Sequence, residues 1–173
     1  HWKWRMRGAA PWFARACAPE LEGPFDAVFA SAYVDLAALV ALAPAVAAAP
    51  KLLYFHENQL EYPMRPEWTG ERDLHFGFTQ LVSALVADRC AFNSAWNRDS
   101  FLNAGRRLVR SMPDAVPPRW IEALRERSVV ASVPLTLPAL PSPVDDPPGD
   151  RSEGPVLLWN HRWEHDKAPS AFV

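Results

Sequence analysis

The stretch LVADRCAFNSAW, residues 85–96, decides the fold class. It holds the end of a helical pattern, a short apolar run at residues 89–92 and the polar pair Asn93-Ser94, in which Ser94 suits the N-cap of a following helix. Helix, strand and helix in close succession are typical of a βαβ unit. We predict that the helix after Ser94 ends at Gly105, because glycine often follows the last helical residue.

The same alternation extends in both directions along the chain. Apolar runs predict strands at residues 25–30, 52–55, 89–92 and 128–133. Helical spacing predicts a helix capped by Asp35 and stopped by Pro44, a long helix at 71–88 and a helix opened by Pro118 that reaches residue 127. The chain is therefore expected to have an α/β fold, a Rossmann-like parallel sheet with helices on both faces.

Proline marks the expected domain boundaries. Residues 134–155 contain seven prolines and little periodicity, which is typical of a semi-rigid linker. We therefore predict a first domain at 1–133, a linker at 134–155 and the start of a second domain at 156–173. That second domain opens with a strand at 156–159 and a helix at Pro169. Because the chain begins with His1 and ends inside this helix, we expect it to be a fragment.

Composition narrows the class of protein. The 173 residues carry 18 basic and 20 acidic side chains, a net charge of -2 that argues against a protein coating nucleic acid by charge alone. No apolar run approaches the ~20 residues of a membrane helix, so we expect a soluble protein without a membrane partner. Two cysteines without a disulfide pattern favour a reducing, cytoplasmic setting. Cys17 and Cys90 lack the CxxC spacing of a metal or redox motif and are expected to be reduced thiols.

Polar residues follow three of the predicted strands, at the edge where open α/β sheets bind ligands. These groups are His56-Glu57-Asn58-Gln59, Asn93-Ser94 and residues 160–167. We expect them to line a cleft. Two alternatives remain open, since His56 can be a loop histidine bonded to backbone and Glu57 a solvated carboxylate.

The third group supports two different interpretations. Arg162 and Lys167 can converge with a helix N-terminus on an anionic group such as a diphosphate, although two solvated cations would give the same pattern. His161, Glu164 and His165 also spell the H-x-x-E-H motif of a zinc hydrolase. That motif needs both histidines on one helical face, whereas His161 directly follows a predicted strand.

The N-terminal segment interleaves aromatic and basic residues. Aromatic and basic side chains together favour contact with single-stranded nucleic acid, and the candidate residues are Trp2, Lys3, Trp4, Arg5 and Arg7. The alternative is the basic face of a helix from about Met6 to Cys17 that packs Trp12 and Phe13 into the core. Residues 1–15 contain four basic side chains and no acidic one.

Four segments together resemble one family. HWKWRMRGAA (1–10), LLYFHENQLEYP (52–63), LVADRCAFNSAWNRDSFL (85–102) and LLWNHRWEHDK (157–167) resemble the tRNA-queuosine mannosyltransferases. The resemblance implies a two-domain glycosyltransferase of the GT-B type that moves mannose from GDP-mannose to queuosine in a tRNA anticodon. Such an enzyme uses no cofactor, and its partners are GDP-mannose and the tRNA.

The resemblance also assigns expected roles to residues of this chain. His56 and Glu57 are expected to face the reaction centre, and Arg162 and Lys167 to hold the donor diphosphate. The expected cleft-lining residues are Asn58, Gln59, Asn93, Ser94 and His161, and the N-terminal segment becomes part of a tRNA-contacting rim. Since the chain lacks an Asp-x-Asp motif, we expect a retaining, metal-independent transfer. The alternatives are a catalytically silent RNA-binding Rossmann module and the zinc hydrolase.

Overall fold

The computed structural model describes residues 2–64, 73–114, 119–136 and 157–172. They divide into two compact units, the first with residues 2–62, 73–114 and 119–132 and the second with residues 63–64, 133–136 and 157–172. Most of the predicted linker lies outside the described residues, as do Pro118, residues 71–72 and residue 156. Each unit is described by itself.

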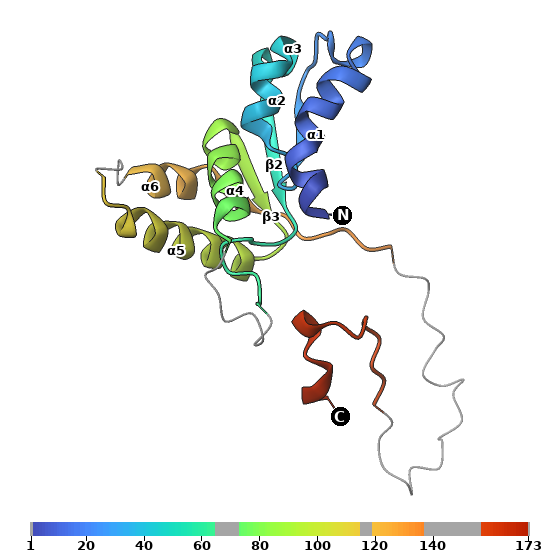
Figure 1. Cartoon of the computed structure of the whole chain (residues 1–173), viewed down its shortest axis with the longest axis vertical. Helices are drawn as coiled ribbons and strands as arrows, with labels where there is room; N and C mark the ends of the chain where they lie inside the picture. The colour runs from blue at the N-terminus through green and yellow to red at the C-terminus, as the bar shows by residue number, and fades with distance from the viewer. Residues whose placement is uncertain (1, 65–72, 115–118, 137–156, 173) are drawn as a thin grey trace, which may run out of the picture. The chain divides into compact units, whose positions relative to one another are not determined.

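A four-stranded parallel sheet forms the centre of the first unit (Figure 1). Its strands are β1 (Val28–Ser31), β2 (Lys51–Phe55), β3 (Arg89–Phe92) and β4 (Ser128–Val130), in the order β1-β2-β3-β4. The four predicted strands of this unit are confirmed, although β1 begins later than residue 25 and β4 ends before residue 133. Strands and helices alternate along the chain, as the predicted Rossmann-like α/β fold requires.

In the described residues, six α-helices accompany the sheet: α1 (Trp2–Ala16), α2 (Leu36–Leu42), α3 (Pro44–Ala48), α4 (His75–Val86), α5 (Ala95–Ser111) and α6 (Arg119–Glu126), with a short 3-10 turn η1 (Pro19–Leu21) after α1. Both predicted N-caps are confirmed. The carboxylate of Asp35 accepts a hydrogen bond from the Ala38 amide at 3.0 Å, and the hydroxyl of Ser94 accepts one from the Asn97 amide at 3.1 Å.

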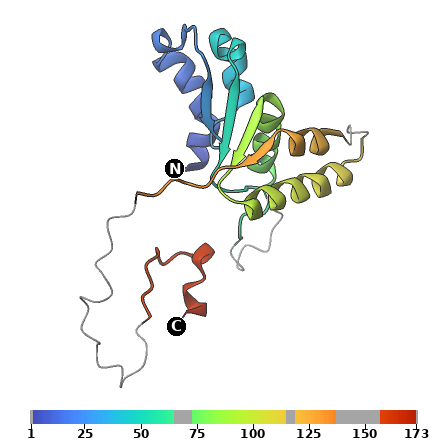
Figure 2. The same cartoon turned by 180° about the vertical axis from the view of Figure 1, so that it is seen from behind.

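The described helices pack on one face of the sheet, so the prediction of helices on both faces is wrong for this part of the chain. One core joins strand residues such as Leu53 and Phe92 to α2, α4, α5 and α6. Among the strand positions of opposite orientation, Phe29 on β1 and Val129 on β4 are exposed, whereas Tyr54 and Ala91 on the central strands are buried without a helix over them. Figure 2 looks onto this open face, with α4 behind the strands. The reason is topological, because strands laid down in chain order through right-handed crossovers place every helix on the same side.

Helix α5 corrects a second prediction, because it continues through Gly105 to Ser111. Gly105 is buried, and a Cβ there would lie 3.0 Å from Cδ1 of Ile121 in α6. The glycine therefore allows α5 and α6 to approach closely and does not mark a helix end.

Helix α1 packs through small and flexible residues. Met6 and Ala10 are buried, and Ala10 joins a second core cluster with Leu39 of α2. The prediction that Trp12 and Phe13 pack into the core is wrong, because they are 59% and 37% exposed. Among the described helices, none combines the length and apolar character needed to cross a bilayer.

Candidate functional site at the carboxyl edge of the sheet

The loop after β2 places His56 at the carboxyl edge of the sheet. Its main-chain oxygen accepts a hydrogen bond from Nδ2 of Asn93 at 2.7 Å, while its side chain is exposed. The imidazole lies edge-on to Tyr54, with ring centroids 4.8 Å apart, and the Tyr54 hydroxyl donates to the main-chain oxygen of Ala131 at 2.8 Å. The backbone of His56 is therefore anchored, and its ring is open to solvent beside the helix-free face.

Glu57 is half-buried and is held at two points. Its Oε1 accepts a hydrogen bond from Nε2 of Gln59 at 3.1 Å, and its main-chain oxygen accepts one from Nε2 of Gln80 in α4 at 3.3 Å. These contacts distinguish it from a freely solvated loop carboxylate and fix it next to His56.

Asn58 and Gln59 are buried, although we expected them to line a cleft. The Asn58 side chain accepts from the Leu60 amide at 2.9 Å and donates to Oγ of Ser100 at 3.0 Å. The main-chain amide of Gln59 donates to Oε1 of Gln80 at 2.9 Å. Within this unit both residues hold the loop in place, and His56 is the exposed residue among the four polar residues 56–59.

Asn93 and Ser94 join the end of β3 to the same loop. Besides its bond to His56, Asn93 accepts a hydrogen bond from Nδ2 of Asn97 at 2.9 Å. Asn97 is itself buried and donates to the main-chain oxygen of Phe55, the last residue of β2, at 3.3 Å. Two of the three polar groups expected at the carboxyl ends of the strands are thus brought together by direct bonds.

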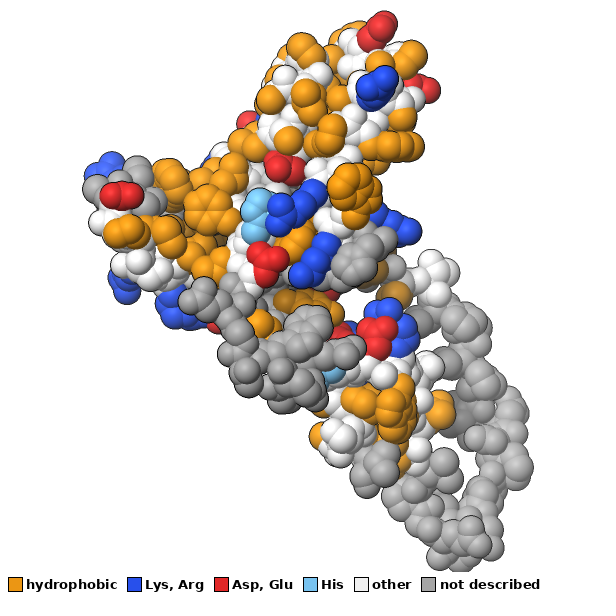
Figure 3. Space-filling model, viewed as in Figure 1, with side chains coloured by type: hydrophobic (Ala, Val, Ile, Leu, Met, Phe, Trp, Pro, Cys, Tyr) orange, Lys and Arg blue, Asp and Glu red, His pale blue; other side chains and the backbone are white. Residues whose placement is uncertain are grey.

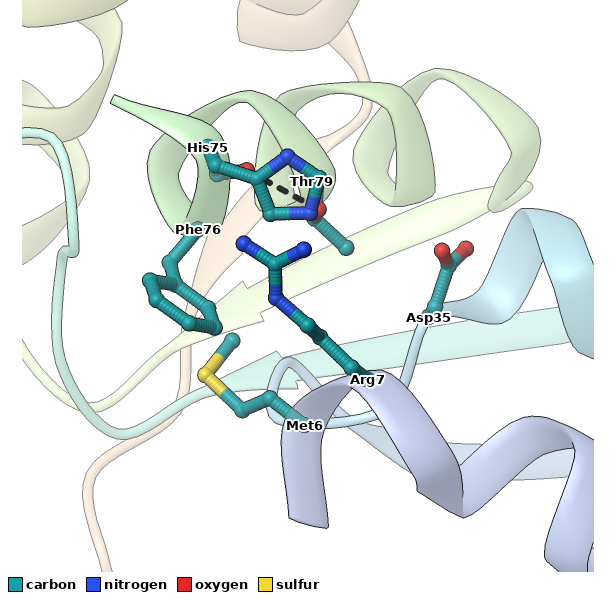
Figure 4. Close-up of a pocket in the computed structure, with 6 residues that line it drawn as sticks. All are labelled: Met6, Arg7, Asp35, His75, Phe76 and Thr79. Carbon is teal, nitrogen blue, oxygen red and sulfur yellow. Dashed lines mark hydrogen bonds between the residues drawn. The ribbon is translucent and has the colours of Figure 1, made fainter. Parts of the chain in front are cut away.

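A hollow of about 210 Å³ lies between α1, the start of α2 and the start of α4, lined by Met6, Arg7, Asp35, His75, Phe76 and Thr79 (Figure 4). The Arg7 guanidinium lies 5.1 Å from the centroid of the Phe76 ring, and the Lys3 ammonium lies 5.6 Å from it. Lys3 also pairs with Asp73 at 3.8 Å. Lys3 and Arg7 therefore tie α1 to α4.

The basic and aromatic residues of the N-terminal segment point to different sides of α1. Lys3 and Arg7 face α4, whereas Trp4 and Arg5 are exposed on another side of α1. The side chain of Trp2 lies outside the described residues. Lys3 and Arg7 therefore lie on a different side of α1 from Trp4 and Arg5.

In the second unit, both basic residues that are expected to bind the donor diphosphate form an ion pair with a nearby carboxylate. Arg162 pairs with Glu164 at 3.1 Å, and Lys167 pairs with Asp166 at 2.7 Å. Residues 165–167 and 169–171 form short 3-10 turns, η3 and η4, in place of the predicted helix at Pro169. Residues 157–159 form no strand, and Leu157 and Leu158 are exposed, so that predicted strand is wrong for the described residues.

The H-x-x-E-H segment is not helical. His161 lies before the first 3-10 turn, its main-chain oxygen accepts from Nε1 of Trp159 at 3.1 Å, and Nε2 of His165 lies 2.7 Å from the main-chain oxygen of Met64. The two histidines do not share a helical face, which the zinc-hydrolase motif requires. No cluster of three metal-binding side chains occurs in the described part of the chain.

Comparison with known proteins identifies the family. Residues 1–135 match the family described as tRNA-queuosine alpha-mannosyltransferase N-terminal. The chain belongs to this family. It is 36% identical over 177 residues to the tRNA-queuosine alpha-mannosyltransferase of Drosophila melanogaster, a match that covers 99% of this chain and 46% of the relative. The chain thus spans about half the length of that relative. No solved structure matches it.

Membership of the mannosyltransferase family confirms the resemblance carried by the four quoted segments. Gln80, Asn97 and Tyr54 also support the polar groups at the carboxyl edge of the sheet through hydrogen bonds. The sequence analysis did not predict a role for these three residues. The available signal was that Gln80 and Ser83 interrupt the apolar face of α4, where both are fully buried. Buried polar side chains in a helix need hydrogen-bond partners inside the protein. Gln80 bonds to the backbone of the loop after β2, and the Ser83 hydroxyl accepts a hydrogen bond from the Leu36 amide at 3.0 Å.

Proposed function

We propose that this chain is part of a two-domain GT-B glycosyltransferase that transfers mannose from GDP-mannose to queuosine in a tRNA anticodon. The observation that carries the proposal is His56, an exposed imidazole on an anchored loop at the carboxyl edge of the sheet, in a chain of this family. Ligands of open α/β sheets bind at this edge. We place the enzyme in the cytoplasm, with the tRNA and the sugar nucleotide as its partners.

The proposed transfer is retaining and independent of metal. The bond between the anomeric carbon and the diphosphate oxygen breaks, and a bond from that carbon to the acceptor hydroxyl oxygen forms. The diphosphate leaves with the bonding electron pair and takes the acceptor proton. His56 would orient the donor sugar, with Glu57 beside it at the reaction centre, and we assign no covalent nucleophile. Precise orientation of this kind contributes strongly to rate, since small misplacements are costly.

Arg162 and Lys167 are proposed to stabilise the charge that develops on the diphosphate. Both cations pair with single carboxylates in the second unit, so the donor would replace Glu164 and Asp166 as their partners. A diphosphate concentrates more negative charge than one carboxylate does. Cations aimed at a leaving group lower the barrier to its departure.

The test uses the protein of the complete reading frame, with mannosylated queuosine measured by mass spectrometry of anticodon nucleosides. We expect His56→Ala to lower kcat by about 100-fold, the scale of a lost positioning contact. Arg162→Ala and Lys167→Ala are expected to lower transfer and to weaken the thermal protection that GDP-mannose gives. Asn103→Ala, at an exposed position of α5, is the control and is expected to leave kcat unchanged.

Two results would overturn the proposal. Unchanged kcat in His56→Ala would remove His56 from the reaction centre. Binding of tRNA without any transfer, together with no thermal protection by a sugar nucleotide, would instead identify a catalytically silent RNA-binding module.

A further inference from the structure

Helix α1 has two opposite faces. Its inner face carries the buried residues Met6 and Ala10. At 3.6 residues per turn, the residues on the opposite side are Trp4, Arg5, Gly8, Trp12 and Arg15, which we call the outer face of α1. Trp4 is 75% exposed and Trp12 is 59% exposed, and both arginines are exposed.

Two large aromatic rings are thus displayed on one ordered helix. Gly8 lies between them, and a Cβ at this position would lie 3.6 Å from Cε2 of Trp4, so the indole lies over the glycine. The two tryptophans are eight residues apart, which corresponds to about 12 Å along the helix axis. Helix α1 contains no leucine, isoleucine or valine, so its outer face is aromatic and not aliphatic.

The charge of this face is uniformly positive. Residues 1–19 contain no Asp or Glu, and no carboxylate in the described part of the chain forms an ion pair with Arg5 or Arg15. Figure 3 shows basic side chains among hydrophobic ones on the side of the first unit that faces the viewer. A polyanion with flat, stackable groups complements this combination, whereas an aliphatic partner surface does not.

We propose that the outer face of α1 binds unpaired nucleotides of RNA, and its relation to the tRNA substrate rests on the proposed function. Bases stack on Trp4 and Trp12, and Arg5 and Arg15 contact phosphates. This surface differs from the contiguous segment expected from the sequence. Lys3 and Arg7 are excluded because they tie α1 to α4, whereas Trp12 and Arg15, which lie beyond that segment, are included.

The experiment measures binding of a fluorescently labelled single-stranded oligouridylate, and of a length-matched RNA duplex, to the 173-residue chain by anisotropy. Stacking predicts that Trp4→Leu and Trp12→Leu each weaken binding of the single strand by about fivefold to a hundredfold. Trp4→Phe, which keeps an aromatic face, is expected to retain most of the affinity. Arg5→Gln and Arg15→Gln are expected to reduce the salt dependence of binding. Arg110→Gln, an exposed arginine in the last turn of α5, is the charge control.

Each contrary outcome has a definite meaning. Equal affinity of Trp4→Leu and the wild type for the oligouridylate would refute the proposal, even if the full enzyme transfers mannose. Equal losses in Trp4→Phe and Trp4→Leu would refute stacking. Dissociation of a dimer by Trp4→Leu with unchanged RNA affinity, or binding to phosphatidylglycerol vesicles without RNA binding, would assign the face to a second copy or to a lipid surface. RNA binding that depends on Trp4 and Trp12, without any mannose transfer, would support this inference and refute the proposed function.

Discussion

Gly77 in α4 is expected to be intolerant of even one added methyl group. A Cβ at this position would lie 2.4 Å from Cδ2, 2.9 Å from Cγ and 3.2 Å from Cα of Leu60. Leu60 is buried, and a rotamer change cannot relieve the contact with its Cα. Overpacking of this kind costs typically about 1–3 kcal/mol, whereas alanine gains about 1 kcal/mol over glycine in a helix interior. Because the backbone of Leu60 must shift, we place Gly77→Ala near the upper end of that cost, a net loss of about 1–2 kcal/mol.

The free energy of unfolding is measured by urea titration of the 173-residue chain, followed by circular dichroism. Gly105→Ala is the matched control, since it is also a buried helical glycine, and its closest contacts are side-chain ends, Cδ1 of Ile121 at 3.0 Å and Cδ1 of Leu81 at 3.8 Å. We expect this control to stay within about 0.5 kcal/mol of the wild type, because helix propensity offsets the strain. Gly77→Ala should also cost less in a Leu60→Ala background, which removes the contacted side-chain atoms. Wild-type stability of Gly77→Ala, or an equal loss in Gly105→Ala, would refute the reasoning.

Three further predictions concern buried and titrating groups. Gln80→Leu removes the partner of two loop backbone groups and is expected to lower the free energy of unfolding by about 1–3 kcal/mol, measured by the same urea titration. Burial raises the pKa of the Cys90 thiol to about 12, so in the folded protein at pH 8 a thiol reagent should modify Cys17 and leave Cys90 unmodified until the chain unfolds. A hydrogen bond from the main-chain amide of Lys51 lowers the pKa of Asp88 below its ordinary 3.8, so the folded state favours the carboxylate. The stability that Asp88 contributes is therefore present above pH 3.8 and is lost as the pH falls through the lowered pKa, and the difference in unfolding free energy between wild type and Asp88→Asn should shrink there.

Local sequence signals were sufficient to predict the strands and the helix N-caps of the first unit. The apolar run at 89–92 and the hydroxyl of Ser94 act within a few residues, and both have the predicted role. The placement of the helices relative to the sheet was predicted wrongly, because it depends on the spatial order of the strands. Gly105 illustrates the same limit, since its function is set by Ile121, which is distant in sequence.

The face of α4 shows why the site could be predicted only in part. Leu74 and Phe78 have the apolar character and helical spacing of core residues, yet both are 41% exposed, while the polar residues Gln80 and Ser83 are buried. Burial of these polar groups is stable only because backbone groups of the loop after β2 and of α2 meet them, and such partners cannot be read from one segment. The exposed position of His56 at the carboxyl edge of the sheet could be predicted because a polar residue directly after a buried strand is a local signal.

The anchoring of the loop after β2 has a consequence for its motion. Loops usually open locally, and their amide protons then exchange with solvent rapidly. The Gln59 amide instead donates a hydrogen bond to the buried side chain of Gln80 in α4, and the Leu60 amide donates one to the buried side chain of Asn58. Exposure of the Gln59 proton to deuterium requires the loop to separate from Gln80 in α4, and exposure of the Leu60 proton requires the buried Asn58 side chain to be released, so both protons should exchange slowly. A loop protected in this way holds the backbone of His56 in place before any substrate arrives.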